Sequence, residues 1–349
     1  MAGGRLSLSV LDLAPVGEGS SPAAALRNSI HLAQRAERLG YRRHWVAEHH
    51  NMPGIASAAP PVVMAHLAGA TSTLRIGSGG VMLPNHSPLV VAEQFGTLEA
   101  LHPGRIDLGI GRAPGTDPVT ARAVRRGAVD EQLTPLLGEL LGYFNGSFPE
   151  EHPFRHIEAT PGLGYQPALW LLGSSDYSAQ LAGLLGLPFS FAHHFSSRNT
   201  DTAVAIYRDT FRPSAMLSEP YVMLGVSVVC ADDHSRARWL AAPSRLSFVR
   251  LRRGRPGRLP TPEEAARYQF TPAERAIAES WTASHVIGDP AAVRQELLDL
   301  VDRTGADELI ITTHVHGHDD RIRSYELVAK ALELQPDGTA AAEVGSSTH

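Results

Sequence analysis

Two short segments, Trp45-Val46-Ala47-Glu48-His49-His50 and Ile76-Gly77-Ser78-Gly79-Gly80-Val81-Met82-Leu83-Pro84, carry the clearest structural signal in this chain. Each has the pattern of a short apolar strand that ends in polar residues or is interrupted by glycines. A strand that ends in Glu-His-His delivers titratable side chains to the edge of a sheet. Glycine has no Cβ, so Gly79 and Gly80 allow a flat ligand to approach the backbone closely. Together the segments predict a pocket at the strand ends of an α/β protein, with a histidine beside a planar cofactor.

Outward from these segments, short apolar runs alternate with stretches whose apolar residues recur at helical spacing. The expected strands are 6–12, 44–47, 75–83, 105–110, 169–172, 188–192, 221–229 and 308–313. The expected helices are 23–39, 60–72, 88–101, 134–143, 178–185, 199–211 and 321–334. Eight strands in alternation with helices favour an α/β fold of the (β/α)8 TIM-barrel type over a doubly wound sheet.

The chain is longer than such a barrel requires. A typical barrel needs about 250 residues, and this chain has 349. We therefore expect a single domain over 1–334 with insertions near 114–130, 144–167 and 243–285, followed by a disordered tail at 335–349. The last insertion contains the arginine-rich run 250–258. This run is interpreted either as a solvated surface segment or as a cover over the active site.

Composition excludes several classes of protein. A net charge of −5 argues against a general nucleic-acid-binding surface. The single cysteine, Cys230, rules out an internal disulfide and a multi-cysteine zinc site, and the single lysine, Lys330, lies in an expected helix rather than at a pocket. We find neither an apolar run of the roughly 18–20 residues that a membrane helix needs nor a signal-peptide pattern. A cytoplasmic protein without a membrane partner is expected.

Polar residues follow several of the expected strands, where the active site of a barrel lies. Arg112 follows the fourth strand, and Gly173-Ser174-Ser175 follows the fifth, directly ahead of a helix. Small residues at a helix N-terminus expose backbone amides, so the segment Gly173 to Ser178 is either a phosphate site or an ordinary helix cap. A guanidinium at the same rim favours the phosphate interpretation.

Histidines gather at the ends of the last strands. His193 and His194 follow the sixth strand, and His314 and His316 follow the eighth. Alternate residues of an extended chain point to one side, so His314 and His316 are able to share a metal ion. Strand one offers only Asp12 as a further ligand. We therefore favour a role in lining a substrate pocket for all four histidines, with metal binding as the lesser alternative.

Four segments in order resemble the bacterial-luciferase-like flavin-dependent monooxygenases. They are Glu48-His49-His50, Gly77 to Pro84, Pro103 to Arg112, and Leu172-Gly173-Ser174-Ser175. The resemblance extends through most of Leu6 to Leu334. Within the family, the chain looks closest to branches found in antibiotic-pathway tailoring.

The resemblance implies a barrel that takes reduced FMN from a separate flavin reductase and oxygenates a substrate through a flavin hydroperoxide. Its catalytic histidine matches His49, after Glu48. The family has two small residues joined by a non-proline cis peptide bond beneath the flavin ring, and Gly79-Gly80 matches this pair. The implied cofactor contacts are completed by Arg112, Gly173, Ser174, Ser175 and Tyr177. Bacterial luciferase has a glutamate where this chain has Gly173, so its long-chain aldehyde substrate is not expected here.

Several further expectations accompany this assignment. The substrate is expected to be a bulky organic molecule, aromatic or polyketide-like, that is hydroxylated or epoxidised. The family's usual homodimer is expected to form through the helices at 60–72 and 88–101. Two other functions stay open: an oxidoreductase that uses the deazaflavin F420, and a flavin-binding or dimer-partner protein without catalysis. Gly109-Ile110-Gly111 lacks the third glycine of a dinucleotide loop, so the sequence gives no support to NAD(P)H binding.

Overall fold

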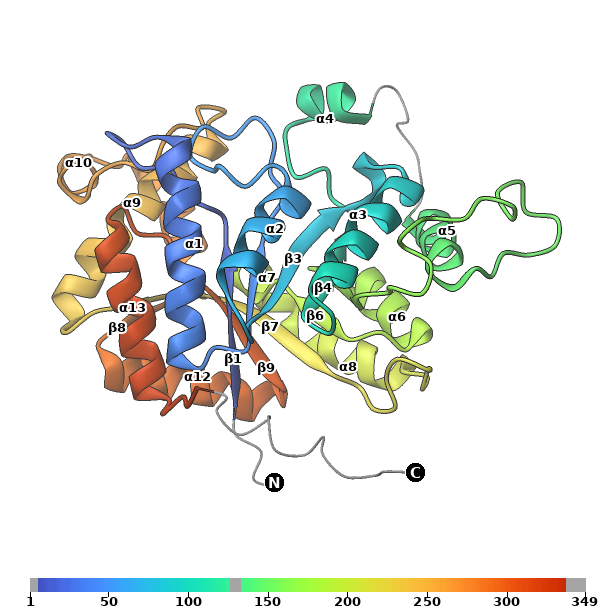
Figure 1. The fold of residues 1–349 in the computed structure, drawn as a ribbon. Helices are drawn as coiled ribbons and strands as arrows, with labels where there is room; N and C mark the ends of the chain where they lie inside the picture. Colours follow the sequence, from blue (N-terminus) through green and yellow to red (C-terminus); the bar gives the residue numbers. More distant parts are fainter. Residues whose placement is uncertain (1–5, 126–132, 337–349) are drawn as a thin grey trace.

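A barrel of eight parallel strands forms the centre of the described part of the molecule (Figure 1). The structure is a computed structural model and describes residues 6–125 and 133–336. The barrel strands are β1 (Ser7–Asp12), β2 (Arg43–Val46), β3 (Arg75–Met82), β4 (Ile106–Gly111), β5 (Ala168–Gly173), β6 (Phe189–Phe191), β7 (Val222–Cys230) and β9 (Glu308–Thr312). Neighbouring strands pair in parallel, and the pairing of Phe189 with Val222 closes the ring. The predicted (β/α)8 barrel is confirmed.

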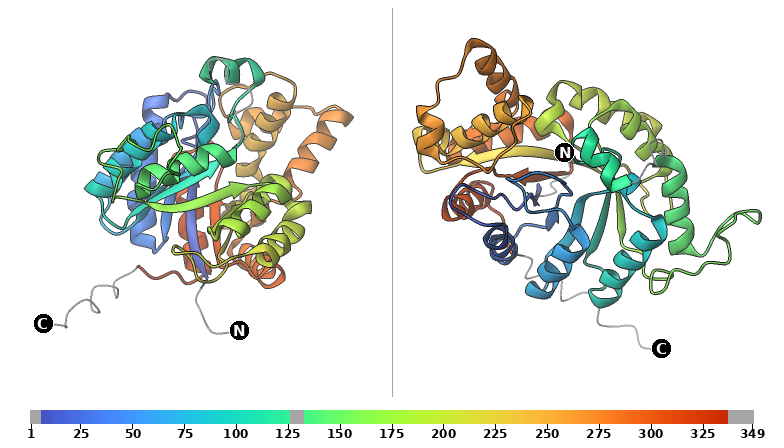
Figure 2. Two further views of the ribbon diagram at one scale, coloured as in Figure 1. Left: turned by 90° about the vertical axis from the view of Figure 1, so that its right-hand side faces the viewer. Right: turned by 90° about the horizontal axis from the view of Figure 1, so that it is seen from above.

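Helices surround the strands on the outside (Figure 2). They are α1 (Pro22–Leu39), α2 (Pro60–Ala70), α3 (Pro88–Leu101), α5 (Leu133–Asn145), α6 (Asp176–Leu185), α8 (Thr200–Thr210), α12 (Pro290–Thr304) and α13 (His318–Ala331). Local sequence fixes many of their ends. Ser21 caps the start of α1 by accepting a hydrogen bond from the backbone of Ala24, and Gly40 ends it in the left-handed region at φ 84°. A main apolar cluster fills the layer between strands and helices.

The remaining elements lie in the connections. They are α4 (Pro118–Arg125), α7 (His193–Ser196), α9 (His234–Arg252), α10 (Pro262–Arg267), α11 (Pro272–Thr282), the short strand β8 (Val286–Gly288), and the 3-10 turns η1 (Leu83–Asn85) and η2 (Ser197–Asn199). Strand β8 extends the sheet beside the end of β7. The sequence patterns did not predict β8 or the helices α4, α7, α9, α10, α11 and α12.

The expected insertions have different structures. Helix α4 occupies part of 114–130, of which 126–130 lie outside the described residues. After the end of α5, the segment 146–167 is an irregular loop that projects from the barrel (green, right of Figure 1). The third insertion does not begin at Pro243 as predicted, because α9 continues through this proline. Pro243 is buried, and the buried face of α9 continues from Leu240 to Val249, so tertiary packing overrides the helix-breaking tendency of proline.

The run 250–258 is partly helical and held by polar contacts. Arg250 lies in the last turn of α9 and pairs with Glu264 at 2.6 Å, and Arg253 pairs with Glu274. Arg258 donates to the carbonyl of Ser20 at 2.9 Å. Apart from 335 and 336, the predicted tail lies outside the described residues. No helix within the described ranges is long and apolar enough to cross a bilayer.

Two layers of side chains fill the barrel interior below the strand ends. In the lower layer, the Arg43 guanidinium lies 3.0 Å from Asp107 and 2.9 Å from Glu308. The upper layer is apolar and contains Leu11, Trp45, Trp170, Met223 and Ile310. Leu11, Trp45 and Ile310 also form the floor of the cavity that opens above them.

Candidate active site

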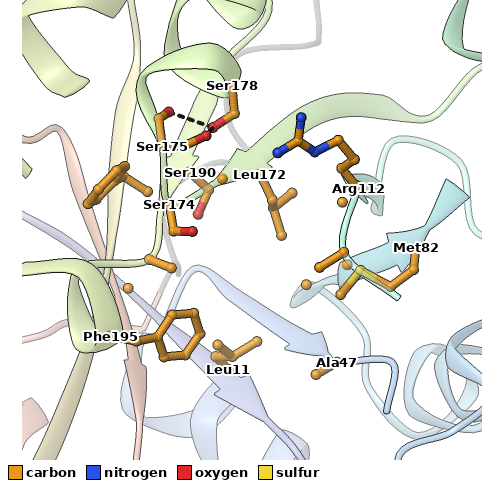
Figure 3. Close-up of a pocket in the computed structure, with 18 of the residues that line it drawn as sticks. Leu11, Ala47, Met82, Arg112, Leu172, Ser174, Ser175, Ser178, Ser190 and Phe195 are labelled. Carbon is orange, nitrogen blue, oxygen red and sulfur yellow. Dashed lines mark hydrogen bonds between the residues drawn. The ribbon is translucent and has the colours of Figure 1, made fainter. Parts of the chain in front are cut away.

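A cavity of about 860 Å³ opens at the carboxyl ends of the barrel strands (Figure 3). Its lining comes from the ends of β2, β3, β4, β5 and β6, because parallel strands deliver their following residues to one rim. Leu11, Ala47 and Phe195 lie toward one end, and Arg112 lies toward the other with Ser175 and Ser178. The cavity therefore has an apolar end and a polar end.

The polar end contains the predicted phosphate residues. Arg112, Gly173, Ser174, Ser175 and Tyr177 all line the cavity. The Arg112 guanidinium lies 4.9 Å from the centre of the Tyr177 ring and has no hydrogen bond or ion pair to another described residue. Ser175 is the N-cap of α6, with no side-chain cap bond of its own. An unpaired guanidinium beside a helix N-terminus fits a phosphate.

Gly173 is required by the packing of this end. A Cβ at residue 173 would lie 1.8 Å from Oγ of Ser178, which itself donates to the carbonyl of Ser175 at 2.8 Å. A glutamate, which bacterial luciferase has at this position, therefore does not fit here. The serines and Arg112 remain as the groups that face an anion.

The glycine pair of β3 lines the cavity beside the apolar floor. The Gly79–Gly80 peptide bond is cis, as the resemblance implied. A Cβ at Gly79 would lie 2.7 Å from Leu11, and one at Gly80 would lie 2.7 Å from the carbonyl oxygen of Gly109. Packing of β3 against its neighbours therefore requires glycine at both positions, and the stretch of backbone that lines the cavity here carries no side chain.

His49 and Glu48, predicted together as catalytic residues, have different positions. His49 lines the cavity, and its Nδ1 lies 3.3 Å from the carbonyl oxygen of Gly115. A carbonyl only accepts, so Nδ1 carries the proton and Nε2 keeps a free lone pair. Burial lowers the pKa of His49 and outweighs the nearby Glu48 carboxylate, so the ring is neutral at pH 7.

Glu48 is not among the described residues that line the cavity. Its buried carboxylate accepts hydrogen bonds from His50 at 2.9 Å, His86 at 2.9 Å, and the backbone of Met82 at 2.9 Å. Burial raises its pKa, but these donors, above all His86, leave the pKa below its usual range. Glu48 therefore positions the loops on both sides of His49 and does not touch a ligand in the cavity. His49 itself bonds to the carbonyl of Gly115 and not to Glu48.

A second chamber of about 340 Å³ adjoins the cavity. The two share Leu13, His49, His194 and Phe195 in their linings. The chamber is lined by the loop Met52 to Ile55 and by residues of α9 and α11, among them Phe248, Leu251 and Trp281. The third insertion therefore forms one wall of a space that meets the larger cavity at His49.

The four histidines predicted to line a substrate pocket divide into two groups. His194 lines both spaces, and His314 lines the chamber. Burial lowers the pKa of each to about 4. His193 instead bonds to Thr200 at 2.7 Å, and His316 to the carbonyl of Glu18 at 3.0 Å. Neither is among the described lining residues, because alternation and local turns point them away from the rim.

The suggested metal pair His314 and His316 therefore does not share one space. Within the described ranges, we find no group of three or more His, Cys, Asp or Glu side chains arranged to hold a metal ion. Sequence reasoning missed Arg125, which lines the polar end and donates from Nε to Asn85 at 2.9 Å. It also missed Leu251, His285 and Thr312 of the chamber. No local motif marks these residues, because distant segments bring them together.

Comparison with known proteins agrees with this geometry. The profile of the luciferase-like monooxygenase family matches residues 6–308. The chain belongs to this family. The chain is 46% identical to a luciferase-like monooxygenase of Escherichia coli K12, over 94% of this chain and 97% of that protein. The predicted family and the prediction of a flavin-dependent oxidoreductase are confirmed.

Two solved structures extend the comparison. The apo form of MsnO8 is 40% identical, with a TM-score of 0.87, and the match covers 95% of this chain and 99% of that one. The oxygenating constituent of 3,6-diketocamphane monooxygenase from Pseudomonas putida was solved in complex with FMN. It is 18% identical with a TM-score of 0.69, over 94% of this chain and 98% of that one, and shares the fold. The antibiotic-tailoring branch stays a prediction.

Proposed function

We propose that this luciferase-like monooxygenase is the oxygenase of a two-component system. A separate flavin reductase supplies reduced FMN in the cytoplasm, and the enzyme hydroxylates or epoxidises a bulky organic substrate with O2. The observation that carries the proposal is the position of His49 in the lining of both spaces, one of which has a polar end with Arg112 and the serines that precede α6. A cofactor in the larger cavity and a substrate in the chamber would meet at this residue.

The residues of the larger cavity fit FMN. Arg112 and the start of α6 would hold the phosphate, and Gly79 and Gly80 would lie against the ring system. Bound reduced FMN supplies two electrons and two protons, so that one oxygen atom of O2 enters the substrate and the other leaves as water. Neutral His49, oriented by Gly115, accepts or returns a proton at Nε2. The apolar floor and the chamber wall exclude water from this junction.

Cofactor choice separates the proposal from its alternatives. The protein is titrated without oxygen with photoreduced FMN and, separately, with reduced F420, and each mixture is then exposed to air. We expect reduced FMN to bind and to be oxidised with O2 uptake coupled to product. Tight F420 binding without O2 uptake would instead support an F420-dependent oxidoreductase. FMN binding with no effect on its oxidation would support the non-catalytic alternative.

The role of His49 is tested by substitution. His49→Ala should bind FMN as the wild type does and lose product formation, because the proposal assigns the proton transfer at the junction to its Nε2. Removing a general acid–base typically costs about 100- to 10,000-fold in rate. His156→Ala, in the exposed loop after α5, is the control and should keep full activity. Unchanged product yield in His49→Ala would contradict the assignment.

We further propose that the enzyme forms a homodimer through α2 and α3. Val62 on α2 and Val90 and Leu101 on α3 expose apolar side chains, although both helices also bury apolar residues against the barrel. A second apolar face suits a partner copy. Light scattering at micromolar concentration should give the mass of a dimer, and Val62→Glu with Leu101→Glu should reduce it to that of one chain. A wild-type monomer would contradict this proposal.

A further inference from the structure

The chamber beside His49 has a lining of unusual chemistry for an arginine-rich protein. None of the described residues that line it is Asp, Glu, Lys or Arg. The larger cavity, by contrast, has Arg112 and Arg125 in its lining. A ligand that enters the chamber therefore finds no fixed charge there.

The insertion that forms the chamber wall directs its arginines elsewhere. Its run 250–258 has arginine at five of nine positions, yet it contributes Leu251, Pro256 and Gly257 to the lining. Arg250 and Arg253 pair with glutamates of α10 and α11, and Arg258 donates to a backbone carbonyl. These three arginines have partners outside the chamber, and none of the five arginines of the run is among the described lining residues. The composition of the run therefore does not predict the charge of the surface that it presents to the chamber.

The polar groups of the chamber are neutral at pH 7. Burial lowers the pKa of His194 and His314 to about 4, and that of His285 to about 3. His49, at the junction, also has a lowered pKa because of burial. These rings, with the hydroxyls of Ser227 and Ser247, offer hydrogen bonds without charge.

Aromatic rings dominate one wall. Phe248 and Trp281 stack with centroids 4.0 Å apart and 10° between their planes, and Phe195 lies nearly parallel to Trp281 at 6.4 Å and 11°. Flat faces of this kind favour stacking with a further ring. The volume of the chamber lies within the range of roughly 300–1,000 Å³ that ligand pockets have.

From this lining we infer that the chamber is the substrate site for an uncharged molecule with an aromatic body, and that it rejects carboxylates. The assignment as a substrate site rests on the proposed function; the selection against charge rests on the lining alone. A carboxylate that enters loses its hydration without gaining a cation, which makes its binding unfavourable. A carbonyl or hydroxyl of a neutral ligand finds imidazole and serine partners instead.

The test compares two probes of nearly the same shape, 2-naphthamide and 2-naphthoate, by calorimetric titration at pH 7.5 without flavin. We expect 2-naphthamide to bind at least about tenfold more tightly, because only the carboxylate has a charge to desolvate. The titrations are repeated with the double variant Arg112→Ala with Arg125→Ala, which removes both arginines in the lining of the larger cavity as a competing site for naphthoate. Equal affinity for the two probes in that variant, or no binding of 2-naphthamide, would overturn the inference.

A cation placed in the wall should reverse the preference. Leu251→Arg introduces a positive charge into the lining and should strengthen 2-naphthoate binding relative to 2-naphthamide by about tenfold. Leu184→Arg on α6 is the matched control, since both leucines lie on helices with similar exposure, 39% and 41%, and Leu184 is outside the described lining. An unchanged probe ratio in Leu251→Arg would overturn the inference. Thr312→Val, a smaller change at the end of β9 in the same lining, removes a buried hydroxyl that has no partner among the described residues. It should weaken 2-naphthamide binding and serves if Leu251→Arg does not fold; unchanged binding would overturn the inference.

These measurements are independent of catalysis. If the enzyme failed to couple reduced FMN to O2, the proposed function would be wrong, whereas the probe ratio would still report the charge of the chamber. If the enzyme coupled FMN to O2 but bound both probes equally, the function would stand and the substrate class would be wrong.

Discussion

At the amino-terminal ends of the strands, the buried Arg43 pairs with the buried carboxylates of Asp107 and Glu308, whereas around the chamber at the other end of the barrel His194, His285 and His314 are desolvated and uncharged. The lower group is paired on every side: Arg75 and Trp45 also bond to Asp107. The upper group surrounds open space. Burying a charge costs free energy at both ends of the barrel. The lower group offsets this cost by pairing opposite charges, and the upper histidines avoid it by staying unprotonated. Only the second solution leaves room for a ligand.

Breaking the lower network should have the largest effect. Arg43→Met leaves Glu308 buried without its cation, and losing one partner of a buried pair costs about 3–5 kcal/mol. The free energy of unfolding from urea titration measures this loss. The control is Arg323→Met, whose exposed pair with Asp232 should contribute less than about 1 kcal/mol. Similar losses in the two variants would show that burial does not distinguish these pairs.

The neutral histidines predict a pH dependence of stability. Because the folded-state pKa of His194 is about 4, below the value of about 6.5 in the unfolded chain, the unfolded state binds the extra proton in this interval. Stability should therefore be full above pH 6.5 and fall as the pH drops toward 4. One pKa unit corresponds to about 1.4 kcal/mol, so His194→Gln should remove up to about 3 kcal/mol of this decrease in the free energy of unfolding. Unfolding titrations between pH 4 and 7 that have the same slope for both proteins would contradict the assignment of a neutral ring.

Arg112 tests whether the polar end of the cavity holds a phosphate. Arg112→Ala should weaken FMN binding by about 10- to 100-fold, since hydrogen bonds to charged groups contribute about 1.5–3 kcal/mol. Riboflavin, which has the same ring system without phosphate, should lose little affinity. Fluorescence titration with both ligands gives the comparison. An equal loss for FMN and riboflavin would place Arg112 against the ring system instead.

The smallest expected effect comes from Gly173, the glycine at the end of β5. Gly173→Ala places a Cβ against Ser178 and should cost about 1–2 kcal/mol of stability through overpacking. Adding Ser178→Gly should recover most of this loss, because it removes both atoms that a Cβ would meet at under 3 Å. Gly69→Ala on α2, where a Cβ meets no atom within 4 Å, should be neutral or stabilising. Equal thermal shifts for the two alanine variants would contradict the steric explanation.

Local patterns predicted most of the barrel but few of the elements in the connections between its strands. Apolar runs bounded by glycine and polar residues mark each barrel strand, and Gly40 ends α1 where expected. Helix α9 escaped prediction because Pro243 interrupts its pattern, although packing on both sides of the proline keeps it helical. Helix α12 was missed even though Asp289 caps its start and Gly305 its end. Capping residues alone were too weak a signal within a long polar segment.

The sequence by itself determined the alternation of strands and helices, the glycine pair of β3, and the residues that follow each strand. These are local properties, set by periodicity and by side chains close together along the chain. Only the tertiary structure decided that His49 lines the cavity while Glu48 positions its surroundings, that His194 and His314 face a chamber while His193 and His316 do not, and that an arginine-rich segment has an uncharged inner surface. The physical reason is that burial and pairing depend on segments far apart in sequence. The same side chain therefore acts as a ligand contact or as internal support according to which distant residues it meets.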